Sequence, residues 1–183
     1  MEAKKLSNEF MQHSAESAAW EEISSDYPLT DGMLEKYADK LDWEEVTGNR
    51  NIHWTVPMLE KFKKRIDWHK FSRYVDEDIL TPSVIEAFKE KWDWDELSEN
   101  NSVPLTDELL MTYADRWNWA KVINRYRGGS LFDGKGISFY ERYKEYIPES
   151  KVQDSCLWRE VVEQTKKQIV ESIIGAQITF DKL

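Results

Sequence analysis

The segment from Gly129 to Gly136 is the closest approach to a catalytic motif in this chain. Gly129, Gly134 and Lys135 fit the opening GxxxxGK of a phosphate-binding loop, whose backbone N–H groups and lysine cradle phosphates. The following residue should be Ser or Thr to hold magnesium, but it is Gly136. The residues before the loop, 119–124, have the pattern of a helix where the motif requires a strand. Nucleotide or phosphate binding through residues 128–136 is therefore the weakest of three functional hypotheses.

Other residues capable of chemistry are scattered. The three histidines, His13, His53 and His69, stand in different parts of the chain, and the single cysteine, Cys156, has no histidine near it in sequence. Metal sites and activated thiols need several such groups together. The acidic run at residues 76–78 lacks the glycine and the distant glutamate of an EF-hand. We expect no catalytic residue, metal site or cofactor, and predict that the protein is not an enzyme.

Basic and aromatic residues alternate between Arg125 and Lys144, where five basic residues stand against two acidic ones. Such a mixture can hold single-stranded nucleic acid or a phosphate ligand. We interpret it first as a local surface for contact with a partner, formed by Arg125, Tyr126, Arg127 and Lys135. The formal net charge of −10 opposes nucleic acid as that partner and favours a protein with a basic surface.

The elements that carry these residues follow an internal repeat of 23 to 26 residues. Each unit has a central aromatic residue, with apolar pairs four and three residues before it and an apolar residue four after it. Tryptophan follows six residues after the aromatic position, and another apolar residue comes three later. The central aromatic residues are Tyr37, Phe62, Phe88 and Tyr113, and the tryptophans are Trp43, Trp68, Trp94 and Trp119.

This spacing predicts two helices in each repeat. The apolar positions around the aromatic residue fall on one face of a longer helix, and the tryptophan begins a shorter one. Asp or Asn stands before each tryptophan and a threonine stands before each longer helix, in the positions of N-caps. These threonines are Thr30, Thr55, Thr81 and Thr106.

The ends of the array are modified. The fifth unit keeps Tyr143 as its central aromatic residue but has Pro148 at the Asp-Trp junction, so the repeats are expected to span residues 20–147. A helix over residues 7–24 should precede them. A helix over residues 154–176 should pack on the last repeat through the apolar stripe that contains Trp158, Ile169 and Ile173. One repeat cannot bury its own apolar face, so we predict a single all-α domain, residues 1–183, folded as an α-solenoid.

The repeat resembles a family of tandem tryptophan-containing helical repeats in bacterial and viral proteins. The pattern is Trp-x-x-apolar-Ser, a variable loop, Leu-Thr, and then Asp-Trp, and the stretch from Trp94 to Ser98 with Leu105, Thr106 and Trp119 follows it closely. The fifth unit departs from it, with Ile123 at the serine position and Phe132 at the threonine position. The resemblance covers about residues 20–147 and implies a fold without catalytic residues.

Composition narrows the functional class. Hydrophobic residues make up 40% of the chain and charged residues 33%, as in soluble globular proteins, and nine tryptophans make it tryptophan-rich. No apolar run approaches the length of a membrane helix, which takes about 20 residues. A single cysteine permits no internal disulfide, which fits a cytoplasmic location.

In repeat proteins, binding is usually carried by the loops that vary between units. The favoured hypothesis is therefore a non-catalytic protein-binding module that uses inter-helix loops and one helix face, with Tyr27, Trp54, Tyr74 and Tyr126 as aromatic anchors. The alternative is a small acidic inhibitor, of the viral anti-defence (anti-CRISPR-like) kind, that occupies the basic nucleic-acid channel of a host enzyme. The sequence predicts no oligomeric state.

Overall fold

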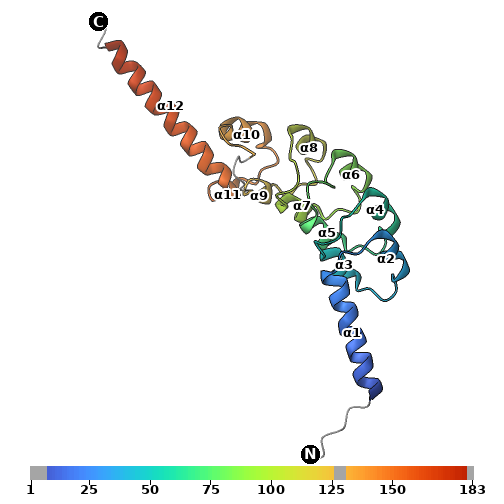
Figure 1. Cartoon of the computed structure of the whole chain (residues 1–183). Coiled ribbons are helices and arrows are strands. Elements are labelled where there is room, and N and C mark those ends of the chain that lie inside the picture. The colour runs from blue at the N-terminus through green and yellow to red at the C-terminus, as the bar shows by residue number, and fades with distance from the viewer. Residues whose placement is uncertain (1–7, 126–130, 181–183) are drawn as a thin grey trace, which may run out of the picture. The chain divides into compact units, whose positions relative to one another are not determined.

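The computed structural model describes residues 8–125 and 131–180, and within these residues every regular element is a helix (Figure 1). The predicted all-α helical-repeat class is confirmed. The helices are α1 (Asn8–Asp26), α2 (Asp31–Lys36), α3 (Trp43–Gly48), α4 (Val56–Phe62), α5 (Trp68–Tyr74), α6 (Pro82–Ala87), α7 (Trp94–Glu99), α8 (Asp107–Thr112), α9 (Trp119–Val122), α10 (Gly136–Tyr143), α11 (Glu149–Val152) and α12 (Cys156–Phe180). In the described part of the chain, none of these helices is long and apolar enough to cross a membrane.

The chain forms two compact units, Met1–Asp93 and Trp94–Leu183. In the first unit, α2, α4 and α6 lie in one row and α3 and α5 in another (Figure 1). In the second unit, α8 and α10 form one row and α7, α9 and α11 the other. Each unit is therefore a stack of helix pairs.

Contacts between tryptophan and the central aromatic residue of the following repeat join neighbouring pairs. In each contact the ring centroids lie 4.7 to 5.2 Å apart, within the range of favourable aromatic pairs. The pairs are Trp20–Tyr37, Trp43–Phe62, Trp68–Phe88, Trp94–Tyr113 and Trp119–Tyr143. The tryptophan register predicted from the repeat is therefore the packing register between repeats.

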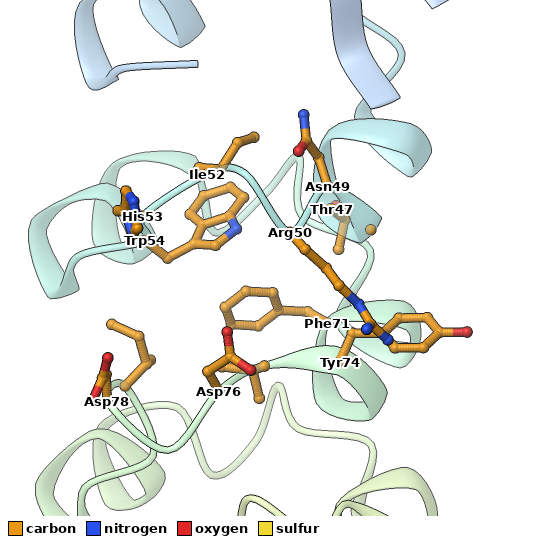
Figure 2. A pocket seen from close by; sticks show the side chains of 13 residues that line it. Thr47, Asn49, Arg50, Ile52, His53, Trp54, Phe71, Tyr74, Asp76 and Asp78 are labelled. Atoms are coloured by element: carbon orange, nitrogen blue, oxygen red, sulfur yellow. The ribbon is translucent and has the colours of Figure 1, made fainter. Parts of the chain in front are cut away.

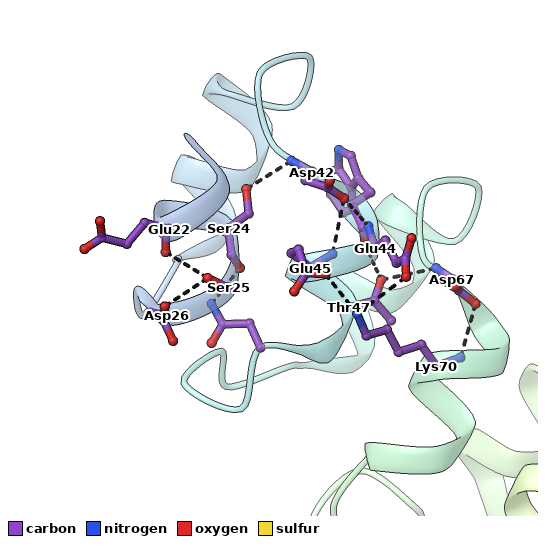
Figure 3. Close-up of polar contacts among 12 residues, drawn as sticks. Glu22, Ser24, Ser25, Asp26, Asp42, Glu44, Glu45, Thr47, Asp67 and Lys70 are labelled. Carbon is purple, nitrogen blue, oxygen red and sulfur yellow. Dashed lines mark hydrogen bonds and ion pairs between the residues drawn. The ribbon is translucent and has the colours of Figure 1, made fainter. Parts of the chain in front are cut away.

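A buried hydroxyl links the repeats at a second position. Ser24, Thr47, Ser72 and Ser98 are each at most 3% exposed. Each hydroxyl donates to the tryptophan carbonyl four residues earlier, at 2.6 to 2.7 Å. It also accepts the backbone N–H of the Asp or Asn that precedes the next tryptophan, at 2.8 to 3.2 Å. Figure 3 shows two of these steps, from Ser24 to Asp42 and from Thr47 to Asp67.

Most predicted helix caps form. Asp42, Asp67 and Asn118 accept hydrogen bonds from backbone N–H groups in the first turns of α3, α5 and α9. Thr55, Thr81 and Thr106 do the same for α4, α6 and α8. The side chain of Thr30 makes no cap hydrogen bond with α2. These caps satisfy N–H groups that a helix of six or seven residues cannot pair internally.

The expected difference between a longer and a shorter helix is found only in the last two repeats, where α8 has six residues against four in α9, and α10 has eight against four in α11. The first helix of the early repeats has six or seven residues, as does the second. The first helix ends at the aromatic position, and a tight turn carries the chain to the next cap. In the first repeat, Lys40 N–H donates to Tyr37 O in this turn at 2.8 Å, and the Trp43 indole donates to Ala38 O at 2.8 Å. The tryptophan thereby holds the turn that shortens the helix.

The fifth repeat extends further than expected. Helix α11 begins after Pro148, in the position of the second helix of a pair, and its Val152 is buried at 6% exposure. The residue at the tryptophan position is Glu149, so the aromatic contact to a further repeat is absent from the sequence. The array therefore ends where its stacking residue is lost.

The predicted docking of the last helix through its apolar stripe is wrong. Helix α12 packs on α10 through a different face, which carries Leu157, Glu160 and Gln164. Leu157 is fully buried, and helical periodicity then places residues 160 and 164 on the same side. Ile169 and Ile173 of the predicted stripe are 55% and 64% exposed. The N-terminal helix, predicted over 7–24, is α1, and it is exposed from residue 9 to 19.

We predict that Ser98→Ala lowers the free energy of unfolding by about 1–3 kcal/mol, because it leaves the part-buried N–H of Asn118 without its acceptor. Ser138 is a matched control, since its exposed hydroxyl only donates to Lys135 O. Ser138→Ala should change stability by no more than about 0.5 kcal/mol. Urea denaturation measures both variants, and equal losses would contradict a structural role for the hydroxyl.

Candidate functional site

The first unit has a groove between two consecutive variable loops, 48–54 and 73–79. The first loop connects α3 to α4 and the second connects α5 to α6. We refer to this feature as the loop groove. It has a volume of about 280 Å³ and is lined by Thr47, Gly48, Asn49, Arg50, Ile52, His53, Trp54, Phe71, Tyr74, Val75, Asp76, Asp78 and Ile79.

A buried asparagine fixes the first loop. Asn49 Nδ2 donates to the backbone oxygens of Ser24 at 2.9 Å and Tyr27 at 2.8 Å, and Asn49 Oδ1 accepts the N–H of Asn51. Because these partners belong to the preceding repeat, the hydrogen bonds of Asn49 fix the backbone conformation of the loop. The groove wall is therefore held in place before any ligand binds.

Aromatic residues form the apolar part of the groove. Trp54 and Phe71 meet edge to face with centroids 5.4 Å apart, and both face the groove in Figure 2. Trp54 occupies the position where other repeats have a leucine such as Leu29 or Leu80, which are buried, whereas Trp54 is half-buried. Among the described residues, Trp54 Nε1 has no hydrogen-bond acceptor, whereas Trp43 and Trp119 donate to backbone carbonyls. Trp54 thus offers both an apolar ring and an N–H donor.

Charged groups stand at the two ends of the loop groove. Figure 2 shows the Arg50 side chain extended toward Tyr74, with Asp76 and Asp78 toward the other end. The Arg50 guanidinium carbon lies 5.4 Å from the Tyr74 ring centroid, which is a cation–π distance. Both aspartates are exposed. The groove therefore has an acidic end beside an indole and a basic end covered by a tyrosine.

A second hollow of about 250 Å³ adjoins the first. It is lined by Ser25, Glu45, Gly48, Arg50, Lys70 and Tyr74, so Gly48, Arg50 and Tyr74 belong to both. Lys70 is paired there with Glu45 at 3.3 Å. The Arg50–Tyr74 pair thus stands between two depressions on the same face of the first unit.

The structure brings together two of the predicted partner-binding residues, Trp54 and Tyr74, which line one groove. Tyr27 is 50% exposed but does not line it. Arg125 is half-buried, and its Nη2 donates to Val103 O at 3.0 Å, so this guanidinium holds the loop of the preceding repeat. Lys135 is exposed at the start of α10. Tyr126 and Arg127 lie outside the described residues.

Sequence reasoning did not single out Arg50, Asp76 or Asp78 as site residues. All three stand in loops whose sequences differ between repeats, and this variation is the signal that could have identified them as site residues. Nothing in the spacing shows that loops of consecutive repeats face one another across a groove. This arrangement follows from the stacking of one helix pair on the next.

The glycine-rich loop is occupied by the protein's own side chains. Gly134 N–H donates to Glu160 Oε1 at 3.0 Å, and Ile137 N–H donates to Gln164 Oε1 at 2.9 Å. Gly134 has φ +65°, a conformation that suits glycine. The element before this loop is α9, a helix. A carboxylate from α12 therefore stands where a phosphate would have to bind; residues 128–130 of the predicted motif lie outside the described part.

Other reactive groups do not gather into a second site. Within residues 8–125 and 131–180, no three His, Cys, Asp or Glu side chains are grouped as a metal site would need. Cys156 is half-buried, and Arg159 Nη2 lies 2.7 Å from its Sγ. His69 Nδ1 lies 2.7 Å from Asp93 Oδ2 on the surface of the first unit.

Comparison with protein-family models, curated proteins and solved structures gives no match to this chain.

We predict that Gly136→Ala loosens α12 from α10. An added Cβ would lie 2.9 Å from Val161 N and 3.0 Å from Glu160 Cγ, so the backbone of α12 must shift, at about 1–3 kcal/mol. Gly175→Ala is the control, because no atom lies within 4 Å of its added Cβ. It should be neutral or stabilise α12 by up to about 1 kcal/mol. Hydrogen exchange in α12 and urea denaturation check both, and an unchanged Gly136→Ala protein would contradict this contact.

Proposed function

We propose that this protein is a non-catalytic protein-binding module whose loop groove receives a basic side chain of a partner protein. The observation that carries the proposal is the acidic, aromatic end of the groove, where Asp76 and Asp78 stand with Trp54. A lysine or arginine entering there would meet carboxylates and the face or edge of an indole. Cation–π contact contributes about 0.5–2 kcal/mol, depending on desolvation.

The preformed state of the groove supports this function. Asn49 ties the first loop to the preceding repeat, so little ordering is needed when a partner binds. Binding costs less when the recognition surface is rigid in the free protein. Trp and Tyr are also the residues that most often dominate binding energy at interfaces. Trp54 and Tyr74 are both accessible from the groove.

The charge of the whole chain points to the same kind of partner. With 35 acidic and 25 basic residues, the formal net charge is −10. Such a field accelerates encounter with basic proteins and repels polyanions. We place the protein in the cytoplasm, on the ground that its single cysteine permits no internal disulfide.

The acidic charge also supports a second candidate function. A small acidic inhibitor would bind the basic nucleic-acid channel of a host enzyme through many exposed carboxylates rather than one groove. Attraction between solvent-exposed charges is screened over about 8 Å at physiological ionic strength. The affinity should therefore fall steeply as the salt concentration rises. This chain should then also compete with nucleic acid for binding to the partner enzyme.

Phosphate binding through the glycine-rich loop has less support, because Glu160 already accepts the Gly134 N–H. A phosphate ligand of this loop would have to displace a carboxylate. Thermal denaturation with ATP or GTP tests it, since a ligand of the native state raises the melting temperature.

We predict that Asp76→Lys weakens binding to a partner captured from lysate and identified by mass spectrometry. The expected loss in affinity is about tenfold, or 1.4 kcal/mol, because the new lysine repels the entering cation. Glu77→Lys is the matched control: it makes the same charge change in the same loop, at an exposed residue that does not line the groove. Its affinity should stay within about twofold.

Trp54→Ala should reduce affinity for the same partner by about thirtyfold, as expected of a hot-spot residue worth 2 kcal/mol. Melting temperatures confirm that the variants fold. Equal losses in Asp76→Lys and Glu77→Lys would show that bulk charge governs binding, and would favour the acidic inhibitor. No loss in either variant, together with full affinity in Trp54→Ala, would exclude the groove as the binding site.

A further inference from the structure

The basic end of the loop groove carries a guanidinium that has no acidic partner. Arg50 is exposed, and within the described part of the chain its side chain makes no ion pair and no hydrogen bond. Its guanidinium carbon lies 5.4 Å from the centroid of the Tyr74 ring, toward which the side chain extends in Figure 2. Stacking on an aromatic face leaves the N–H groups in the guanidinium plane free. Arg50 is therefore held in place with its donors available to a ligand.

Other cations close to this end of the groove are placed differently. Lys70 lines the second hollow beside Arg50, but its ammonium nitrogen lies 3.3 Å from a carboxylate oxygen of Glu45. Arg73 also lies against Tyr74, with its guanidinium carbon 5.8 Å from the ring centroid, yet it lines neither hollow. Arg50 lines both hollows. The positive charge that a ligand meets at this end is therefore that of Arg50.

The loop groove carries opposite charges at its two ends. Asp76 stands with Trp54 toward one end, and Arg50 stands toward the other (Figure 2). The lining that joins them includes the buried side chains of Phe71 and Val75. Charges of opposite sign on a fixed surface select both the composition and the register of what binds. A segment that uses the whole groove therefore carries one cationic and one anionic group.

We propose that Arg50 is an anion subsite, and that the loop groove binds a partner segment in which an acidic side chain accompanies the basic one. This inference rests on the proposed function and adds the second group by which the partner is recognised. The acidic side chain is that of Asp or Glu. Its carboxylate accepts two parallel N–H groups from the guanidinium of Arg50, in the plane that the Tyr74 ring leaves open.

A carboxylate suits this subsite better than a phosphate. Phosphorylated residues carry about 1.5–2 negative charges at neutral pH and are typically recognised by clusters of arginines. Arg50 is a single guanidinium, and Asp76 and Asp78 line the same groove. Together with the net charge of −10, these aspartates repel a ligand in proportion to its negative charge. A singly charged carboxylate meets less repulsion and matches one guanidinium.

Blocked synthetic peptides test the anion subsite. An alanine peptide with one arginine is compared with peptides that add a glutamate at successive positions on either side of the arginine. NMR signals of the Trp54 indole N–H and the Arg50 Nε–H report the two ends of the groove separately. The best arginine–glutamate peptide should bind about threefold to fivefold more tightly than the arginine peptide, and should shift both signals.

Substitutions beside the Tyr74 ring separate the subsite from general charge. Arg50→Gln should abolish the gain from glutamate, while Trp54 still responds to arginine. Arg73→Gln is the matched control, because it removes the other guanidinium beside the same ring at a residue that lines neither hollow, and it should keep the gain. Arg50→Glu should reverse the preference, so that a peptide with lysine in place of glutamate binds more tightly. Since Arg50 is exposed, these variants should keep their melting temperatures.

The outcomes distinguish the subsite from the proposed function. A glutamate that adds nothing in any peptide, or a gain that survives Arg50→Gln, would overturn the anion subsite and leave the cation site at Trp54 in place. A glutamate-only peptide that shifts Arg50, with no response of Trp54 to arginine, would overturn the proposed function and support the Arg50 subsite alone. Tighter binding of a phosphoserine peptide than of the glutamate peptide would overturn the assignment to a carboxylate. No shift with any peptide would overturn both.

Discussion

The stability of this fold depends on contact between repeats, because no single helix pair has enough surface to bury. Helices of six or seven residues are far too short to be stable alone in water, where about 12–15 residues are marginal. Each repeat therefore places a tryptophan against the central aromatic residue of the next. The same step recurs in both units, from Trp20–Tyr37 to Trp119–Tyr143. The aromatic contact sets the distance between successive helix pairs.

The buried hydroxyls add direction to that apolar contact. A ring pair tolerates sliding and rotation, whereas a hydroxyl that donates to one repeat and accepts from the next allows only one register. Ser24 and Thr47 do this at buried positions where an unpaired N–H would be costly. Ion pairs such as Lys121–Asp95 follow the same spacing, and the hydrogen bond with Asp95 raises the pKa of Lys121, against an opposing effect of burial. Being partly exposed to solvent, such pairs add little stability.

Packing and capping use the residues that repeat, which leaves the loops between the helices available for binding. The positions that repeat are occupied by packing and capping, and the residues between them vary without disturbing the stack. In the first unit, two such loops form a groove with acidic and aromatic walls, tied to the scaffold by Asn49. Arg125 is an exception among the residues that vary between repeats. Its guanidinium donates a hydrogen bond to a backbone carbonyl of the preceding repeat, so it serves the scaffold. Variation between repeats is therefore a signal of binding only where the side chain is not already bonded to the scaffold.

Periodicity in the sequence determined the all-α class, the tryptophan register and most N-caps, because helix periodicity and capping depend on residues close together in the chain. It also singled out Trp54, at the position where other repeats have leucine, and Tyr74, in a variable stretch, as aromatic anchors. Only the tertiary structure decided that these two residues share a groove with Arg50, Asp76 and Asp78, because the groove exists only when one pair stacks on the next. It likewise decided which face of α12 is docked. An apolar stripe predicts burial but not its partner, and here Leu157 and the Glu160 hydrogen bond turned the stripe outward.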